Sequence, residues 1–324
     1  MILAGDIGGT KTLIGLFEFA DRRPIQVDTQ SYPTTAYPGL PAIIEEFCKT
    51  RGAKPAVTVA VFGIAGPIIN QHAEMTNVEW HVDAAELTRV FAFPKVRLLN
   101  DLEAMAYGVP VLDASELTTL QAGRSNPDGN IGLMAAGTGL GQSLLHRIDA
   151  RYVPVASEGG HTDFAPRTDR EIELARFLRD RFGRAEIEHV LSGPGLLNLS
   201  NFTHQDGACD SQAHLDDCPD VPAEVSKSAL EGNCPDCAEA LDLFVSAYGA
   251  SAGNLALTGM TTGGIFLGGG IAPKILPALQ DGRFLHSFVD KGPMRPLLEA
   301  MPVHVILNAQ SGLLGAAVYA NGMR

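Results

Sequence analysis

Basic side chains are scarce in this chain, which carries 24 Lys and Arg against 37 Asp and Glu and has a formal net charge of -13. An acidic surface repels phosphate backbones and anionic lipids, and no run of Lys or Arg offsets that repulsion. We therefore expect a protein that binds neither nucleic acid nor a membrane surface.

Cysteine is scarce too, with 5 residues in a chain of 324. An odd number does not suit a disulfide framework, and the opening sequence MILAGDIGG has neither the basic segment nor the long apolar segment of a secretory leader. Cysteines in such a chain are typical of a reducing compartment, so we expect a cytoplasmic location.

Long unbroken apolar runs are missing as well. Residues 243–273 carry no charge and are long enough for a membrane span, but Gly, Thr and Ser interrupt them throughout. This stretch predicts a buried helix followed by a buried strand. The apolar content of 45% is enough for the cores of two α/β domains.

The fingerprints GxxxxGK[ST] and GxGxxG fit neither of two glycine hairpins that the chain does contain. Residues 2–19 predict a strand, a glycine turn at 8–10 that permits positive φ, and a second strand. Backbone N–H groups of that turn, with the Thr10 hydroxyl and the Lys11 ammonium, can cradle phosphate oxygens, and Asp6 can hold Mg²⁺ through water. The alternative is an ordinary hairpin.

The same design recurs at residues 131–148, where two apolar segments flank the turn Gly137, Thr138 and Gly139. Two hairpins of one design suggest an internal duplication with a nucleotide bound between the halves. We therefore expect phosphate binding by a pair of hairpins.

Asn100 and Asp101 follow the apolar run 96–99, which predicts a buried strand of a parallel sheet. Ligand-binding groups of open α/β sheets gather just outside the carboxyl ends of the strands. The alternative is a strand exit or a helix cap, because Asn and Asp are common in both. The glycine hairpins in the same chain favour chemistry at Asp101.

Three further acceptor or donor groups stand on predicted loops. Glu158 and His161 are separated by two glycines, so both can turn toward one small polar ligand. Zinc is disfavoured there because the pair does not lie on a predicted helix. Glu188 precedes a break at residues 192–195, where its side chain can reach a cleft, although a solvated surface acid is the alternative.

Glycine also ends a predicted buried strand within residues 261–273. The turn Gly268, Gly269 and Gly270 lets an adenine and a ribose lie close to the backbone, while tight packing of the chain is the alternative reason for glycine.

Residues 203–222 are rich in Asp, Gly and Pro and predict a mobile surface loop. A structural zinc is an alternative use of the Cys and His residues in and after this segment. The chain has a single CxxC, and it opens a long predicted helix rather than a zinc knuckle, which disfavours zinc. The residues concerned are His204, Cys209, His214, Cys218, Cys234 and Cys237.

Several segments, in register along essentially the whole chain, resemble the bacterial glucokinases. They are DIGGTKT at Asp6, AGP at Ala65, LLNDLEAMAYG at Leu98, AAGTGLG at Ala135, EGGHTDFAP at Glu158, VLSGPGLLNL at Val190, FLGGGIAPK at Phe266 and SGLLGAA at Ser311.

The resemblance implies an enzyme that converts glucose to glucose 6-phosphate with ATP and Mg²⁺, at the entry to glycolysis. It also implies the fold of the hexokinase and actin-like superfamily, with two α/β, ribonuclease-H-like domains whose mixed five-stranded sheets flank a central cleft. A small domain would take residues 1–110 and 302–324 and a large domain residues 111–301, and the chain would form a homodimer.

Roles for individual residues come with the resemblance. Asp101 would be the general base for the 6-hydroxyl of the sugar. Asn100 and Asp101 would hold its 3- and 4-hydroxyls, and Glu158, His161 and Glu188 its 1- and 2-hydroxyls. The ATP phosphates would lie at Gly5, Asp6, Ile7, Gly8, Gly9 and Thr10 and at Gly137, Thr138 and Gly139, the adenosine at Gly269 and Gly270, and Mg²⁺ at Asp6 through water.

Lys11 departs from this pattern. With Lys11, the segment DIGGTKT resembles the neighbouring family of sugar kinases and repressors, whose zinc signature CxCGxxGCxE this chain lacks. A kinase for another hexose or hexosamine is therefore an alternative. A sugar sensor without catalysis is a second alternative, and its usual sign, a helix-turn-helix before the first hairpin, is not seen.

Overall fold

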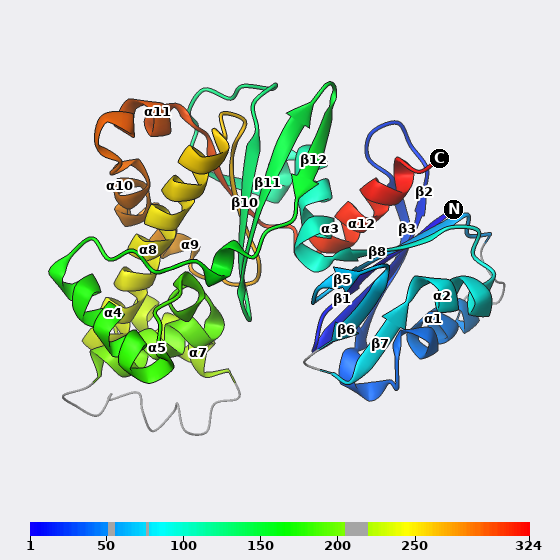
Figure 1. Ribbon diagram of the computed structural model, residues 1–324, viewed down its shortest axis with the longest axis horizontal. Helices are drawn as coiled ribbons and strands as arrows, with labels where there is room; N and C mark the ends of the chain where they lie inside the picture. Colours follow the sequence, from blue (N-terminus) through cyan, green and yellow to red (C-terminus); the bar gives the residue numbers. More distant parts are fainter. Residues whose placement is uncertain (51–55, 76–77, 205–219) are drawn as a thin grey trace. The chain divides into compact units, whose positions relative to one another are not determined.

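The computed structural model describes residues 1–50, 56–75, 78–204 and 220–324, and the chain divides into two compact units. The first unit comprises Met1–Ala114, Tyr152–Pro154 and Asn308–Arg324, and the second comprises Ser115–Arg151 and Val155–Leu307. Each unit is a mixed sheet with helices packed on it (Figure 1). Within the segment expected to be a surface loop, residues 205–219, with Cys209, His214 and Cys218, lie outside the described residues.

The sheet of the first unit has the strand order β3-β2-β1-β4-β8. Its strands are β1 (Ile2–Ile7), β2 (Lys11–Glu18), β3 (Ile25–Pro33), β4 (Val59–Ile64) and β8 (Val96–Asn100). β1 pairs antiparallel with β2 and parallel with β4, which is parallel to β8. The register places Ile7 opposite Ile64 and Ile64 opposite Asn100. The ends of β1 and β8 therefore lie in one row, which brings Asp6 and Asp101 to the same edge of the sheet.

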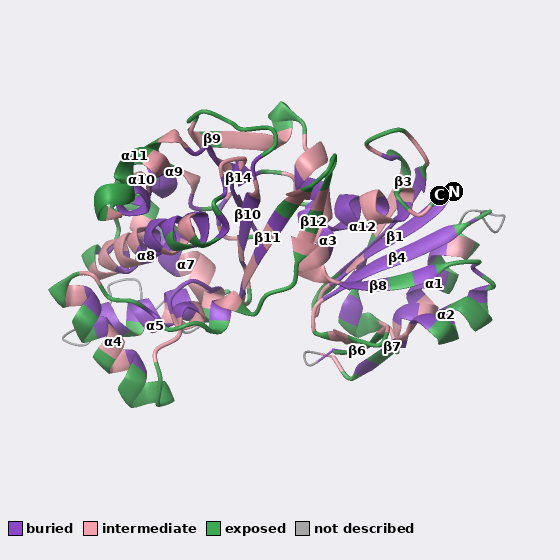
Figure 2. Ribbon diagram, turned by 45° about the horizontal axis from the view of Figure 1, so that its top comes forward, coloured by how far each residue is buried: buried purple, intermediate pink, exposed green. Residues whose placement is uncertain are grey.

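Helices cover both faces of this sheet because side chains of β1 alternate between two apolar cores. Leu3 and Ile7 pack in the core that contains α1 (Leu40–Lys49) and α2 (Ala84–Phe91). Ile2 and Ala4 pack instead with α12 (Ser311–Asn321), which also contacts α3 (Asp101–Gly108). Figure 2 shows that β1 and β4, at the centre of this sheet, are buried. A small sheet of β5 (Ile68–Ile69), β6 (His72–Met75) and β7 (Trp80–Asp83) completes the unit.

The sheet of the second unit has the order β12-β11-β10-β13-β14-β9. Its strands are β9 (Leu117–Gln121), β10 (Ile131–Ala136), β11 (Leu140–Ile148), β12 (Arg151–Val155), β13 (Gly264–Gly268) and β14 (Val303–Ile306). β10 is antiparallel to β11 and parallel to β13, as β1 is to β2 and β4. The sheet thus has a sixth strand beyond the five expected. Because β14 pairs with β13 and β9, residues 303–306 lie with the second unit rather than with α12.

The long helix α8 (Pro235–Gly259) forms the centre of the second core. It packs against α5 (Gly193–Thr203), α7 (Val221–Glu231) and α10 (Arg283–Val289) through side chains such as Phe244 and Tyr248. The remaining α-helices of this unit in the described residues are α4 (Asp169–Phe182), α9 (Leu276–Gln280) and α11 (Arg295–Ala300). The expected buried helix and strand within residues 243–273 are confirmed as α8 and β13. None of the described helices is long and apolar enough to cross a membrane.

Candidate active site

The first glycine turn, residues 8–11, joins β1 to β2 and is closed by the Gly8 N–H, which donates to the Lys11 carbonyl at 3.0 Å. The expected turn is present, and neither Gly8 nor Gly9 is among the described glycines with positive φ, so the turn does not use the positive φ that glycine permits. What glycine provides here is space, because a Cβ on Gly8 would lie 3.0 Å from the Lys11 carbonyl oxygen.

Thr34, which is fully buried in the short helix η1 (Thr34–Ala36), anchors this turn. Its hydroxyl donates to the Gly8 carbonyl at 2.8 Å and lies 2.9 Å from the hydroxyl of buried Thr12, and its N–H donates to the Thr10 carbonyl at 2.9 Å. Sequence reasoning missed both threonines, because a Thr beside a strand is ordinary and nothing in the local pattern marks these two.

Asp6 lies half-buried at the end of β1, beside the start of α12. A Cβ on Gly312 would come 2.8 Å from Asp6 Oδ2, so glycine at that position makes room for the carboxylate. Burial, together with the negative charge of Asp101, raises the pKa of Asp6 to about 6, while the Lys11 charge opposes the shift. Two carboxylates that repel one another in a half-buried place form a site that a cation would stabilise.

Asn100 is the N-cap of α3, and its Oδ1 accepts the N–H groups of Leu102 and Glu103 at 3.0 and 3.3 Å. One hydrogen of its Nδ2 goes to the Gly66 carbonyl at 3.1 Å, which leaves a second amide hydrogen for another acceptor. The helix-cap alternative is therefore true of Asn100. A ligand can still use the remaining N–H.

Asp101 is the first residue of α3, and its Oδ1 accepts the Leu102 N–H at 2.8 Å. The positive end of the helix stabilises a carboxylate in the first turn. α3 can start so close to the sheet because of Gly63 on β4, where a Cβ would lie 2.7 Å from the Cβ of Ala104. The close packing of β4 against α3 at Gly63 thus holds Asp101 at the ends of the strands.

The second glycine turn, residues 137–139, joins β10 to β11, and the Gly137 N–H donates to the Gly139 carbonyl at 2.9 Å. The Gly137 carbonyl accepts the Gly193 N–H at 2.8 Å, so the first residue of α5 lies against the turn. A Cβ on Gly137 would meet no atom within 4 Å. The backbone of this turn is therefore open to a ligand on that side.

Glu188, in the short helix η5 (Ile187–His189), is not the solvated surface acid of the alternative reading. Its Oε2 accepts the Leu140 N–H at 2.7 Å, and a Cβ on Gly139 would lie 2.7 Å from the same oxygen. Glu188 therefore braces the second turn and occupies the space that a side chain at Gly139 would need. Its other carboxylate oxygen is available to a ligand.

Glu158 caps the short helix η4 (Gly159–His161), and both Glu158 and His161 are exposed. The His161 Nδ1 lies 2.8 Å from Glu186 Oε2, and this hydrogen bond raises the pKa of His161, with smaller contributions from the negative charges of Glu188, Glu186 and Glu158. The same bond lowers the pKa of Glu186. Arg184 holds the loop from the other side by donating to the His161 carbonyl at 2.7 Å.

Glu186 is a partner of the expected site residue His161 that sequence reasoning did not single out. By bonding Nδ1 it fixes the His161 ring and directs Nε2 away from the protein partner, where a ligand can reach it. The signal was present in the sequence as a second acid two residues before Glu188, but only the fold places it beside a histidine 25 residues earlier.

The glycine turn after β13 lies against the end of β10. Gly269 has φ +82°, and the Ile271 N–H donates to the Ala136 carbonyl at 3.2 Å, so the turn is packed beside the residue that precedes Gly137. A Cβ on Gly270 would meet nothing within 4 Å. Tight packing is therefore confirmed at Gly269, while Gly270 has an open backbone and its contact with adenosine stays a prediction. Residues 137–139, Glu188, Gly193 and Gly269–Gly270 form one group.

A cavity of about 300 Å³ opens in the second unit beside this group. It lies between β11, the η4 loop and α8, and its lining includes Gln142, Gly159, Thr162 and Asn254. Glu158, His161 and Glu188 are not among its lining residues. Their sequence neighbours Gly159, Thr162 and Ile187 do line it, so the cavity adjoins the loops that carry the expected sugar contacts.

Comparisons with known proteins show the family and the fold of this chain. A model of the glucokinase family matches residues 3–323. A glucokinase of Nostoc sp. is 38% identical over 337 residues, which cover 99% of this chain and 98% of the relative. The solved structure of a glucokinase from an Antarctic psychrotroph is similar with a TM-score of 0.86 and 30% identity, and covers 99% of this chain and 98% of its own.

A ROK-family glucokinase from Streptomyces griseus, solved with glucose and AMPPNP, has a TM-score of 0.68 at 21% identity, and the alignment covers 99% of each chain. At that identity the likeness speaks for the fold alone. With the psychrotroph structure, it confirms the expected two-domain, actin-like α/β fold.

Proposed function

Because this chain belongs to the glucokinase family and phosphorylates glucose with ATP to give glucose 6-phosphate, we propose that Asp101 accepts the proton of the 6-hydroxyl. The observation that carries this proposal is the sheet register, which ends β1 and β8 in one row and so brings Asp101 beside Asp6. A base at this point adjoins both the strand-end polar groups and the first phosphate turn. The start of α3 stabilises the carboxylate form that a base needs.

Phosphoryl transfer depends mainly on positioning and on neutralising charge. We assign the ATP phosphates to the turns at Gly5–Thr10 and Gly137–Gly139, and the adenosine to Gly269 and Gly270. The open sides of Gly137 and Gly270 support this assignment. The Streptomyces griseus relative was solved with AMPPNP, an ATP analogue, which agrees with ATP as the donor.

Mg²⁺ fits at Asp6, where we place it through water. Its preferred ligands are hard oxygens, and the half-buried carboxylate of Asp6 lies near the negative charge of Asp101. A bound Mg²⁺ would neutralise phosphate charge during transfer. The ion would also stabilise the ionised form of Asp6, whose pKa burial and the Asp101 charge raise to about 6.

The sugar hydroxyls are assigned to groups with unused hydrogen-bonding capacity. Asn100 offers its second amide hydrogen, His161 offers Nε2, and Glu188 offers Oε1, while Glu158 is exposed on the same loop as His161. A pocket built from such directed polar groups discriminates strongly between sugars. We also propose that the chain acts as a homodimer in the cytoplasm, with sedimentation of the purified protein as the test of its oligomeric state.

The test is a panel of initial rates of ADP formation with Mg-ATP and glucose, mannose, fructose or N-acetylmannosamine. We expect glucose to give the highest kcat/KM, and Asp101→Asn to lower kcat by about 10² to 10⁴ while glucose binding in calorimetry persists. Asp113→Asn, on the surface of the same unit, is the matched control.

Near-normal turnover in Asp101→Asn would remove Asp101 as the base. Preference for another sugar would favour the hexosamine or hexose alternative. Saturable glucose binding without turnover by the unmodified chain would favour a sensor.

A further inference from the structure

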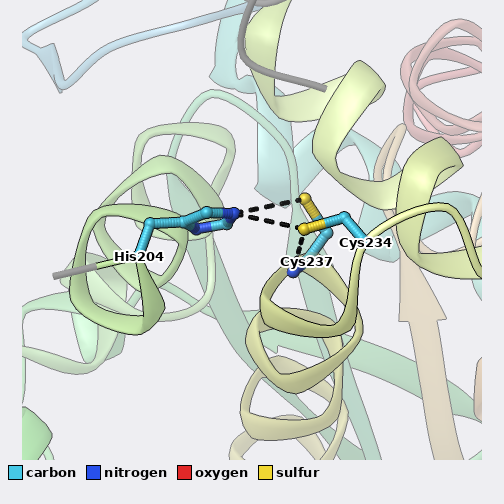
Figure 3. A group of neighbouring side chains, drawn as sticks. All are labelled: His204, Cys234 and Cys237. Atoms are coloured by element: carbon cyan, nitrogen blue, oxygen red, sulfur yellow. Dashed lines mark hydrogen bonds between the residues drawn. The ribbon is translucent and has the colours of Figure 1, made fainter. Parts of the chain in front are cut away.

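A cluster of nitrogen and sulfur ligands lies in the second unit, apart from the residues assigned to the reaction. Its members are His204, Cys234 and Cys237, and their ligand atoms all lie within 4.8 Å of one another (Figure 3). His204 follows the last residue of α5, Cys234 is the N-cap of α8, and Cys237 is the third residue of α8. The two cysteines are 3% and 0% exposed, so the sulfur atoms face the protein interior.

The spacing of these atoms fits a tetrahedral metal ion. With Zn–S and Zn–N bonds of about 2.3 and 2.0 Å, a tetrahedral angle separates nitrogen from sulfur by about 3.6 Å. The His204 Nε2 lies 3.4 Å from Cys234 Sγ and 3.9 Å from Cys237 Sγ. Both nitrogen–sulfur distances therefore lie within a few tenths of an ångström of the tetrahedral value, and the two sulfurs lie within 4.8 Å of each other.

The histidine is held in the tautomer that a metal requires. Its Nδ1 lies 2.7 Å from the Ser200 carbonyl oxygen, which can only accept, so Nδ1 carries the hydrogen. Nε2 therefore presents its lone pair to the two sulfurs. Donation of the second ring N–H to a backbone carbonyl is the usual arrangement of zinc-bound histidine.

The start of α8 fixes the positions of both cysteines. The Cys237 N–H donates to Cys234 Sγ at 3.4 Å, which holds the N-cap and the first turn of α8 together. The Thr203 hydroxyl donates to the Asp236 carbonyl at 2.9 Å, which fixes the end of α5 against the same turn. The end of α5 and the start of α8, which are far apart in the sequence, are thus held together at the cluster.

We propose that His204, Cys234 and Cys237 bind one structural zinc ion that ties the end of α5 to the start of α8. Two thiols lose their protons to solvent when the ion binds, and a further ligand completes the tetrahedron. The site stands apart from the phosphate turn, because the helix α5, which runs 11 residues at about 1.5 Å per residue, separates His204 from Gly193. The inference does not depend on the assignment of the reaction.

The ordinary alternative is a packing pair in which a thiol hydrogen-bonds to the imidazole. Metal analysis of the full chain, purified without chelators and exchanged into metal-free buffer, separates the two. We expect about one zinc per chain in the unmodified protein and less than about one tenth in Cys234→Ser/Cys237→Ser. Cys48→Ser, which changes a cysteine of the first unit, should keep its zinc.

A second measurement needs no variant, so it holds even where the double variant fails to fold. We expect the chelator-treated chain to bind one Co²⁺ and to develop the visible bands of tetrahedral cobalt together with a near-ultraviolet thiolate-to-cobalt band. Unmodified protein without zinc and without those bands would overturn the proposal. A disulfide between Cys234 and Cys237 in the purified protein, detected by mass after alkylation, would overturn it as well, whereas His204→Ala with weakened cobalt binding would support it.

Discussion

The two glycine hairpins share one topology and differ in how they manage charge. In each hairpin the first strand pairs antiparallel with the second and parallel with another strand of its sheet. β1 pairs in this way with β2 and β4, and β10 with β11 and β13. The first hairpin carries Asp6 one residue before its last strand position, whereas the second has Ala135 at that place. The first hairpin therefore carries a carboxylate next to its turn, whereas the second has a small apolar side chain at the equivalent strand position.

The two turns are also held differently. Hydroxyls of Thr12 and Thr34 hold the first, whereas the carboxylate of Glu188 and the N–H of Gly193 hold the second. A duplicated backbone can thus be stabilised by unrelated side chains. The two hairpins have the same backbone topology, and they differ in the side chains that hold their turns.

Asp6→Ala would make the first hairpin match the second, and we expect the largest effect from it. Removing the carboxylate that we assign to Mg²⁺ should lower kcat by about 10² to 10³, with a raised KM for Mg-ATP and little change in the circular dichroism spectrum. Kinetics at saturating glucose over a range of Mg²⁺ would measure this. Asp113→Ala is the control, and a variant of normal kcat would deny Asp6 that role.

Gly137→Ala tests whether the open side of the second turn serves a ligand. A Cβ there meets no protein atom within 4 Å, so the melting temperature should stay unchanged while the KM for ATP rises about 10- to 100-fold. Gly139→Ala is the matched comparison, because its Cβ would meet Glu188 Oε2 at 2.7 Å and should lower the melting temperature. An unchanged KM in Gly137→Ala would count against phosphate binding at this turn.

Asp6→Asn sharpens the charge difference through pH. The pKa of Asp6 is raised from 3.8 to about 6, so the folded state favours the protonated form and the carboxylate costs stability above pH 6. We expect the Asn variant to gain about 1 to 3 kcal/mol in free energy of unfolding at pH 7 to 8, without ligands. The gain should fade as the pH drops from 6 to 4, and urea titrations across that range would show it; a pH-independent difference would contradict the assignment.

Thr34→Val tests the hydroxyl anchor of the first turn, which has no counterpart in the second. The substitution keeps the shape but removes the donor to the Gly8 carbonyl and the partner of the Thr12 hydroxyl. The free energy of unfolding should fall by about 1 to 2 kcal/mol, because those groups are buried. Thr29→Val, whose hydroxyl makes a 3.3 Å bond near solvent, should lose much less, and equal losses would argue against a special role for Thr34.

The strands and turns of the candidate site could be predicted from the sequence because glycine turns and buried strands are local signals. The strand before Asn100 and the two hairpins follow from apolar runs and glycine spacing. Gly8 and Gly9 do not use the positive φ that glycine permits, and at Gly8 the nearby Lys11 carbonyl is what leaves no room for a side chain. Local composition does not distinguish those two causes.

Side-chain partners from distant segments were beyond reach. Glu186 orients His161, and Gly312 makes room for Asp6, only because the fold joins loops far apart in the sequence. The CxxC at Cys234 was discounted for opening a long helix, yet the helix start is what directs both sulfurs at His204. A ligand supplied by another helix leaves no trace at the motif itself.

The packing of α12 on β1 has a consequence for the order in which the chain can fold during synthesis. Ile2 and Ala4 find their apolar partners in Leu313 and Ala316, which are translated only after the whole second unit. Until α12 is made, the apolar core on one face of the first unit's sheet is therefore incomplete, whereas the second unit can complete its own core. Ribosome-bound chains that stop before residue 311 should consequently hold a folded second unit beside an unfinished first, and a kinase activity that appears only at the last step of elongation.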